Sequence, residues 1–174
     1  MKTREVKKEE AARLYRRLYR LFDKVTPLKK DCGALCGGAC CRGDDNTGMR
    51  LFPGEPTALP VTQTGNGRFV LCGGVCDRAE RPLACRIFPF FPVPDESGRI
   101  RAVADPRALP VCPLARQAAA VAFDRRFLRR VKKAGKLLSA REDCLAFLRG
   151  TAADFEEIRA LRALLENEAK EKKE

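Results

Sequence analysis

Residues 32–41 read CGALCGGACC, which places cysteines at positions 32, 36, 40 and 41. Residues four apart lie on one face of a helix, and thiolates around a tetrahedral metal ion need about that separation. The neighbouring glycines weaken a regular helix, but they let the backbone approach sulfur closely and donate N–H groups to it. The stretch therefore predicts a segment held by a metal rather than by a hydrophobic core.

Four more cysteines follow within the Gly- and Pro-rich middle of the chain. The predicted metal ligands are Cys32, Cys36, Cys40, Cys41, Cys72, Cys76, Cys85 and Cys112. Eight thiolates match two four-sulfur sites, either zinc sites or [4Fe–4S] clusters. The count equally allows one metal centre together with cysteines that are not ligands. The ninth cysteine, Cys144, falls in a helical stripe, where an ordinary buried thiol is expected.

The composition narrows the chemistry of the site. The 174 residues include 35 Lys or Arg, 23 Asp or Glu and no His, which gives a formal net charge of +12. Without histidine, zinc sites of the Cys2His2 or Cys3His kind and two-His-one-carboxylate iron sites are excluded. Ser-His-Asp and Cys-His nucleophilic centres are excluded too. Any bound metal is therefore held mainly by sulfur, and a carboxylate ligand stays open as an addition.

The N-terminal residues 1–10 are charged throughout and lack the apolar region of a secretory signal. No stretch approaches the roughly 18 apolar residues of a membrane span. We therefore expect a cytoplasmic protein that does not enter a membrane. Thiols stay reduced in the cytosol, so clustered cysteines are expected to be metal ligands or redox groups rather than disulfides. The odd number of cysteines and the adjacent pair at 40–41 agree with that expectation.

Composition divides a single domain, residues 1–174, into three regions. Residues 1–30 hold a helix to about residue 26, residues 31–113 a cysteine-cluster core, and residues 114–174 charged helices. The predicted fold is mainly α with a small irregular α+β core, whose short strands and loops are tied by metal. The predicted strands are residues 49–52, 68–71, 90–93 and 99–103.

Helix signals divide the C-terminal region further. Apolar spacing predicts one long helix from about Leu114 to Gly135. Residues 139–142, Ser-Ala-Arg-Glu, form a capping box for the next helix, and Gly150 fits its end. Residues 151–154 resemble the start of a last helix, whose tail is expected to fray.

Arginines and aromatic residues surround the later cysteines. Arg81 and Arg86, together with Arg78, are predicted to lie around the metal ligands, offset their negative charge and donate to sulfur. Binding of a substrate anion and simple solvent exposure are the alternatives. The phenylalanines of residues 88–91 are expected to cover the cluster, and an exposed platform for nucleic-acid bases is the alternative.

Two further elements complete the motif: the vicinal Cys40-Cys41 pair and the segment Arg81-Pro82-x2-Cys85-Arg86-x2-Pro89. In this combination, residues 31–113 resemble the YkgJ family of cysteine-cluster proteins. The resemblance implies chelation of zinc or iron through these cysteines, and it implies no particular reaction. A flagellin lysine N-methylase carries a similar cluster, so a protein-modifying role follows by analogy alone.

Three functional hypotheses follow. The first is a cysteine-cluster metalloprotein that chelates zinc or iron, including iron as [4Fe–4S], with an unknown reaction. The second is an iron–sulfur or iron-dependent redox or group-transfer enzyme, such as a protein-lysine methylase-like modifier. The third is a basic module that binds RNA or another polyanion weakly through helices such as residues 125–136.

Overall fold

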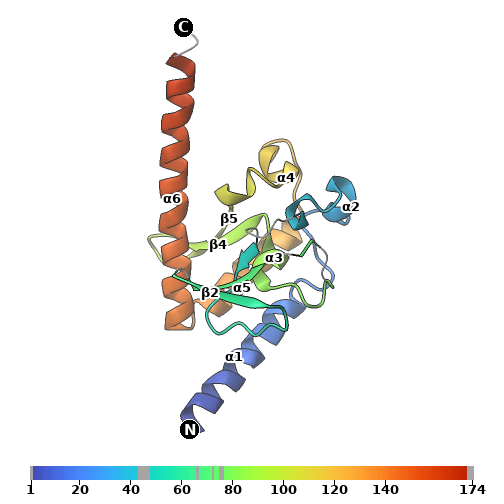
Figure 1. The fold of residues 1–174 in the computed structure, drawn as a ribbon, viewed down its shortest axis with the longest axis vertical. Coiled ribbons are helices and arrows are strands. Elements are labelled where there is room, and N and C mark those ends of the chain that lie inside the picture. Colours follow the sequence, from blue (N-terminus) through green and yellow to red (C-terminus); the bar gives the residue numbers. More distant parts are fainter. Residues whose placement is uncertain (1, 43–47, 66, 72, 75–76, 172–174) are drawn as a thin grey trace.

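The computed structural model describes residues 2–42, 48–65, 67–71, 73–74 and 77–171. Its elements, in chain order, are α1 (Lys2–Arg20), α2 (Cys32–Cys36), η1 (Ala39–Cys41), β1 (Gly48–Arg50), β2 (Val61–Thr64), β3 (Gly67–Leu71), α3 (Leu83–Ile87), β4 (Phe90–Pro94), β5 (Ile100–Ala104), η2 (Pro106–Ala108), α4 (Pro113–Arg116), α5 (Arg125–Leu138) and α6 (Glu142–Glu171). The fold is mainly α with a few short antiparallel strands, as the sequence predicts. In Figure 1, α1 and α6 project in opposite directions, while α2 and α4 lie on the side away from α6.

The core forms where three helices pack against the β4–β5 hairpin. Helix α5 presents its apolar side to the hairpin, and α6 covers β4 next to it. Gly135 lets α5 approach closely, because a Cβ there would lie 2.5 Å from Pro92 and 2.6 Å from Ile100. Helix α1 ends at Arg20 rather than near the predicted residue 26. Ring contacts extend the core to the turn that follows it, where Phe22 meets Phe127 with centroids 5.8 Å apart. This cluster excludes water along the whole contact.

The strand predictions are confirmed within one to two residues at each end. Strands β1, β3 and β2 form a three-stranded antiparallel sheet in that order, and β4 pairs with β5 in a hairpin. The register pairs Phe91 with Val103 and Arg50 with Phe69. Strand β2 was not predicted, because its sequence, Val-Thr-Gln-Thr, is exposed throughout and has no buried face to set an alternating pattern.

The prediction of one helix from Leu114 to Gly135 is wrong. The chain forms the short helix α4, turns, and starts α5 at Arg125. Asp124 decides the break, because its carboxylate accepts a hydrogen bond from the Arg126 N–H (2.7 Å) and caps the new helix. Helix α5 then runs past Gly135 to Leu138.

Two further helix signals are also overturned. Ser139 is the C-cap of α5, and its hydroxyl donates to the Lys136 carbonyl (3.1 Å) rather than capping α6. Helix α6 continues through Gly150 without a break. Its buried residues Cys144, Leu148, Thr151 and Phe155 recur at helical spacing across the expected stop, and their burial outweighs the low helix propensity of glycine.

Among the described residues, no helix is long and apolar enough to cross a membrane.

Candidate metal centre

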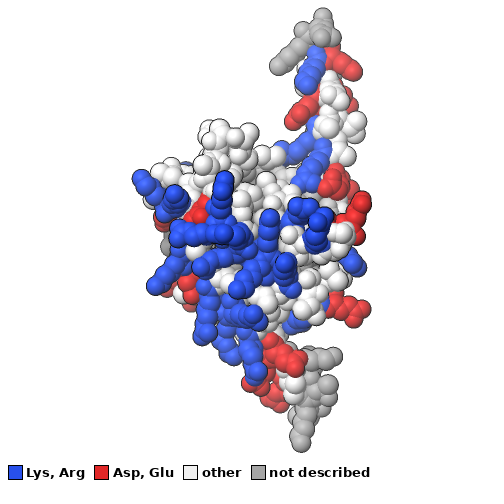
Figure 2. All heavy atoms as spheres, turned by 180° about the vertical axis from the view of Figure 1, so that it is seen from behind, with Lys and Arg blue, Asp and Glu red and all other residues white. Residues whose placement is uncertain are grey.

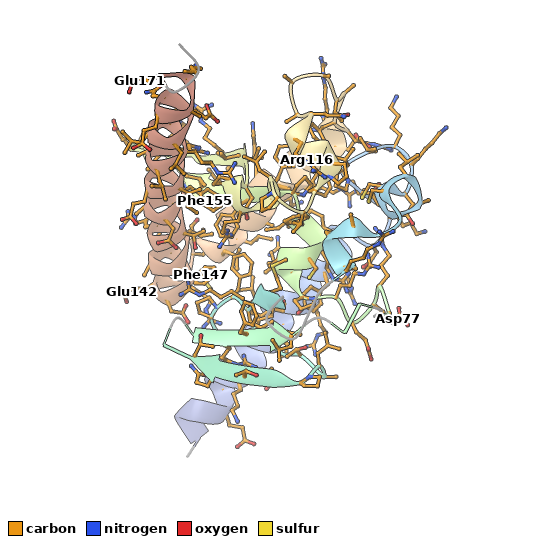
Figure 3. All side chains as sticks on the ribbon, turned by 45° about the horizontal axis from the view of Figure 1, so that its top comes forward. Asp77, Arg116, Glu142, Phe147, Phe155 and Glu171 are labelled. Atoms are coloured by element: carbon orange, nitrogen blue, oxygen red, sulfur yellow. The ribbon has the colours of Figure 1, made fainter. Side chains whose placement is uncertain are left out.

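Six of the predicted ligands line one cavity of about 110 Å³. They are Cys32, Cys36, Cys40, Cys41, Cys85 and Cys112. They come from three segments that are distant in sequence: the α2–η1 stretch, α3, and the residue before α4. In Figure 3, Asp77 and Arg116 lie on this side of the molecule, opposite α6, whose Phe147 and Phe155 belong to the core side. The cysteines thus converge away from the main packing of the helices.

Helix α2 owes its local shape to caps rather than to packing. Asp31 precedes it, and the carboxylate accepts a hydrogen bond from the Gly33 N–H (3.1 Å). Gly37 and Gly38 follow with φ of +61° and +67°, a conformation that favours glycine. This double left-handed turn ends α2 and carries the chain into η1, so that the first two and the last two cysteines of the stretch face one cavity.

Neither α2 nor η1 contains a buried residue. Leu35, the one large apolar side chain of α2, is 65% exposed. Burial of apolar surface is the main force that holds a segment in place, and these two elements lack it. The cysteine-bearing stretch is therefore positioned by its caps rather than by buried apolar surface.

Helix α3 holds Cys85 at the cavity wall. Leu83 and Ile87 are fully buried on one side of the helix, which turns Cys85 toward the other. Arg86 fixes the loop that leads into α3, because its guanidinium donates to the carbonyls of Arg81 (2.7 Å) and Ala79 (2.6 Å). It also lies over the Tyr19 ring, 4.5 Å from the centroid. The loop before α3 is thereby folded against α1.

The predicted arginines lie at the cavity. Arg78, Arg81 and Arg86 all belong to its lining. Arg86 also pairs with Asp23 (3.3 Å) through a side chain that is 5% exposed. The described hydrogen bonds of Arg86 go to carbonyl and carboxylate oxygens. This side chain therefore shapes the loop that leads to Cys85.

Cys112 is buried and reaches the cavity from the other side. Its N–H donates to the Ala108 carbonyl (2.7 Å), which joins the end of η2 to the start of α4. A small apolar cluster of Ala108, Cys112 and Ala115 holds this corner, with Phe88 against it. Phe88 is also part of the cavity lining. The expectation that phenylalanines cover the cluster fails for Phe90 and Phe91, which pack into the main core.

The thiols influence one another's ionisation. Burial raises the pKa of Cys40 to about 12, and the adjacent Cys41, Cys32 and Cys112 add to the rise. Burial likewise raises the pKa of Cys32, with contributions from Asp31, Cys36 and Cys112. These influences join Cys112 to the cysteines of the α2–η1 stretch, which line the same cavity. In this state Cys32 and Cys40 stay protonated at neutral pH.

Within the described ranges, no set of three or more Cys, Asp or Glu side chains is arranged to hold one metal ion. The predicted ligands Cys72 and Cys76 lie outside the described residues, as do the carboxylates at 44 and 45. Seven cysteines are described, and no disulfide joins any of them. Cys144 does not line the cavity: its Sγ lies 3.9 Å from the Tyr15 hydroxyl in the core, the buried role expected of it.

Other residues of the cavity were not predicted from the sequence. Phe22, Val25 and Pro27 line it. The helical spacing of Phe22 and Val25 indicated only that they face a core, and Pro27 indicated only the end of a helix. Asp31 is the one carboxylate of the lining among the described residues, and it is occupied as the N-cap of α2. An aspartate directly before a Cys-Gly pair is a cap signal that could have located it.

The chain matches no family model, and no curated protein or solved structure matches it either. Its function is therefore inferred from the residues and their geometry.

Proposed function

We propose that this protein binds zinc or iron through cysteine thiolates at the cavity between α2, α3 and α4. The observation that carries the proposal is the convergence of six cysteines from three separate segments on one cavity. A fold that only buried these thiols would have no reason to collect them away from the main core. Iron as an ion and iron as [4Fe–4S] are both compatible with sulfur donors alone.

The chemistry of the cavity wall suits a thiolate-bound metal. Such a site carries net negative charge, and three arginines stand in the lining to balance it. A bound cation lowers the pKa of a coordinating thiol, so binding would convert the ligand cysteines to thiolates, and ligands that are protonated beforehand, such as Cys40, would release protons. The residues that would hold the metal are drawn from the six cysteines of the cavity, with Cys72 and Cys76 as further candidates.

Metal binding also accounts for the sparse packing of α2 and η1. A metal bond can supply the folding free energy that buried apolar surface supplies elsewhere, and these elements bury no residue. The proposed role is therefore structural first: the metal fastens the Gly-rich stretch to α3 and α4. A cytoplasmic location fits this role, because a reducing compartment keeps the thiols available.

The motif resemblance to YkgJ cysteine-cluster proteins supports the same conclusion. We propose membership of that family on the vicinal pair and the Arg-Pro-x2-Cys-Arg element, which enclose the described cavity. The resemblance favours chelation and leaves the reaction unspecified.

The proposal is tested by metal content in cysteine variants. Protein purified without oxygen should contain stoichiometric zinc or iron by mass spectrometry of the elements. The substitutions Cys40→Ser and Cys85→Ser, both in the cavity lining, should each lower the metal content severalfold. Cys144→Ser is the matched control, since it removes a buried thiol outside the cavity and should leave the metal content unchanged.

Circular dichroism of the same samples shows whether the helical core has folded. Wild-type protein without metal would refute the proposal. So would folded variants of Cys40 and Cys85 that keep the wild-type metal content.

A further inference from the structure

Helix α5 presents a solvent face made only of basic residues. Its exposed positions are Arg125, Arg126, Arg129, Lys132, Lys133 and Lys136. The helix contains no acidic residue, and its other side is buried against the hairpin. An ordinary solvated helix mixes both signs of charge, because like charges three or four residues apart repel. On α5, like charges lie next to one another along the whole exposed face.

Helix α1 extends this surface. Its exposed positions from residue 13 onward are Arg13, Arg16, Arg17 and Arg20. The C-terminal end of α1 contacts α5, where the Arg130 guanidinium donates to the Leu21 carbonyl. We call these ten exposed side chains of α1 and α5 the basic face. Figure 2 shows Lys and Arg gathered on this side of the molecule, with acidic side chains mostly at the margins.

Most of the charge on the basic face is not neutralised within the described part of the chain. Arg126 pairs with Asp124 (3.0 Å) and Arg13 with Glu9 (3.7 Å). The other eight side chains of the face form no ion pair among the described residues. Helix α6, in contrast, carries more acidic than basic residues. Positive charge is thus concentrated on the basic face, while α6 carries the excess of negative charge. A surface with a concentration of positive charge attracts a polyanion.

The basic face lacks the apolar groups that other anionic partners require. Phe22 and Phe127, the aromatic residues where α1 meets α5, are at most 1% exposed. Of the described residues, these two rings are therefore not available on the basic face to stack unpaired bases, and the ten side chains that form the face offer no apolar wedge to a lipid bilayer. The charged groups of the basic face can instead contact phosphates. Seven of the ten are guanidiniums, which bind phosphate oxygens in pairs.

We infer that the basic face binds double-stranded RNA through its backbone phosphates, independently of base sequence. The two helices meet near the C-terminal end of α1, so the ten side chains spread over two elements rather than along one helix that could enter the roughly 12 Å major groove of B-form DNA. The minor groove of A-form RNA is wide and shallow and is recognised by shape and phosphate contacts. The inference is independent of metal binding, because the basic face contains none of the cysteines.

The test is fluorescence anisotropy with a labelled RNA duplex of about 20 base pairs. Binding should weaken about a hundredfold or more between about 50 and about 200 mM salt, since each neutralised phosphate releases counterions. The triple variant Arg129→Gln, Lys133→Gln and Lys136→Gln should bind at least tenfold more weakly, with a shallower salt dependence. Glutamine keeps the helix propensity nearly unchanged.

The matched control removes three positive charges from α6 by Arg149→Gln, Arg162→Gln and Lys170→Gln. It should bind RNA within about twofold of wild type, and both triple variants should keep the wild-type metal content. Absence of RNA binding at low salt, or equal weakening in the control, would overturn the inference. Equally tight binding of duplex DNA or of vesicles rich in phosphatidylserine would overturn the choice of RNA. If the wild-type protein self-associates and the α5 triple variant does not, the basic face would instead bind the acidic α6 of a second copy, and the inference would be overturned.

Discussion

Glu55 is a buried carboxylate that joins three parts of the chain. Its side chain is fully buried, and Oε1 accepts hydrogen bonds from the Tyr19 hydroxyl (2.8 Å) and the Leu83 N–H (2.6 Å). Oε2 accepts one from the Phe52 N–H (3.0 Å). Burial raises the pKa of Glu55, and these three donors oppose the rise. The residue thus fixes α3, and with it Cys85, to α1.

Replacement of Glu55 by Gln should destabilise the fold by about 1–3 kcal/mol. The amide has one acceptor oxygen for three donors, so its NH₂ group would face a buried N–H. The free energy of unfolding from urea titration measures the effect. Glu96→Gln, at an exposed position of the β4–β5 turn, is the control and should change stability by less than about 0.5 kcal/mol. Equal stability of the two variants would show that Glu55 does not hold α3 in place.

At the scale of single residues, the sequence predicted the cysteines better than it predicted Glu55. The clustering of cysteines in residues 32–41 indicated a shared site, and the structure brings those side chains to one cavity with Cys85 and Cys112. The turn at Gly37 and Gly38, and not one continuous helix face, places Cys40 there. Glu55 stands alone in a loop rich in proline. Its role comes from contacts with Tyr19, which lies 36 positions earlier in the chain, and Leu83, which lies 28 positions later. No local sequence pattern encodes such distant contacts.

Two glycines, Gly135 in α5 and Gly150 in α6, show how tertiary packing decides whether a helix continues. Gly135 lies inside α5 against the hairpin, whereas Gly150 lies inside α6 with no heavy atom within 4 Å of an added Cβ. Both were predicted to end helices, since glycine is common after a helix C-terminus. The buried stripes of α5 and α6 continue past them, so tertiary packing overrides the local signal.

The same substitution should have opposite effects at these two sites. Gly135→Ala should destabilise the protein by about 1–3 kcal/mol, because the new methyl group clashes with Pro92 and Ile100. Gly150→Ala should stabilise it by up to about 1 kcal/mol, because alanine is the better helix former and the site is open. Thermal unfolding of the two variants measures the signs. A stabilising Gly135→Ala would contradict the close packing of α5 on the hairpin.

The molecule as a whole combines two modes of stabilisation. Helices α1, α5 and α6 and the hairpin share a buried aromatic and aliphatic cluster, and the α2–η1 stretch has none of it. The division into a helical frame and a cysteine-rich middle could be predicted from composition. The path of the middle could not, because it depends on caps and loop contacts rather than on periodic burial.

Metal removal should therefore act on one part of the molecule. Treatment of the metal-loaded protein with a strong chelator should speed amide hydrogen exchange in α2 and η1 and leave α5 and β4–β5 protected. Exchange followed by mass spectrometry resolves these peptides. Loss of protection across α5 would mean that the metal supports the whole fold, and no change in residues 32–41 would mean that the metal does not hold them.

X-ray absorption at the metal edge of protein purified without oxygen tests the central claim most directly. The account predicts a first shell dominated by sulfur, at about 2.3 Å for zinc, with no imidazole signal. A first shell made of oxygen or nitrogen atoms would contradict the assignment of the cysteine-lined cavity as the metal centre.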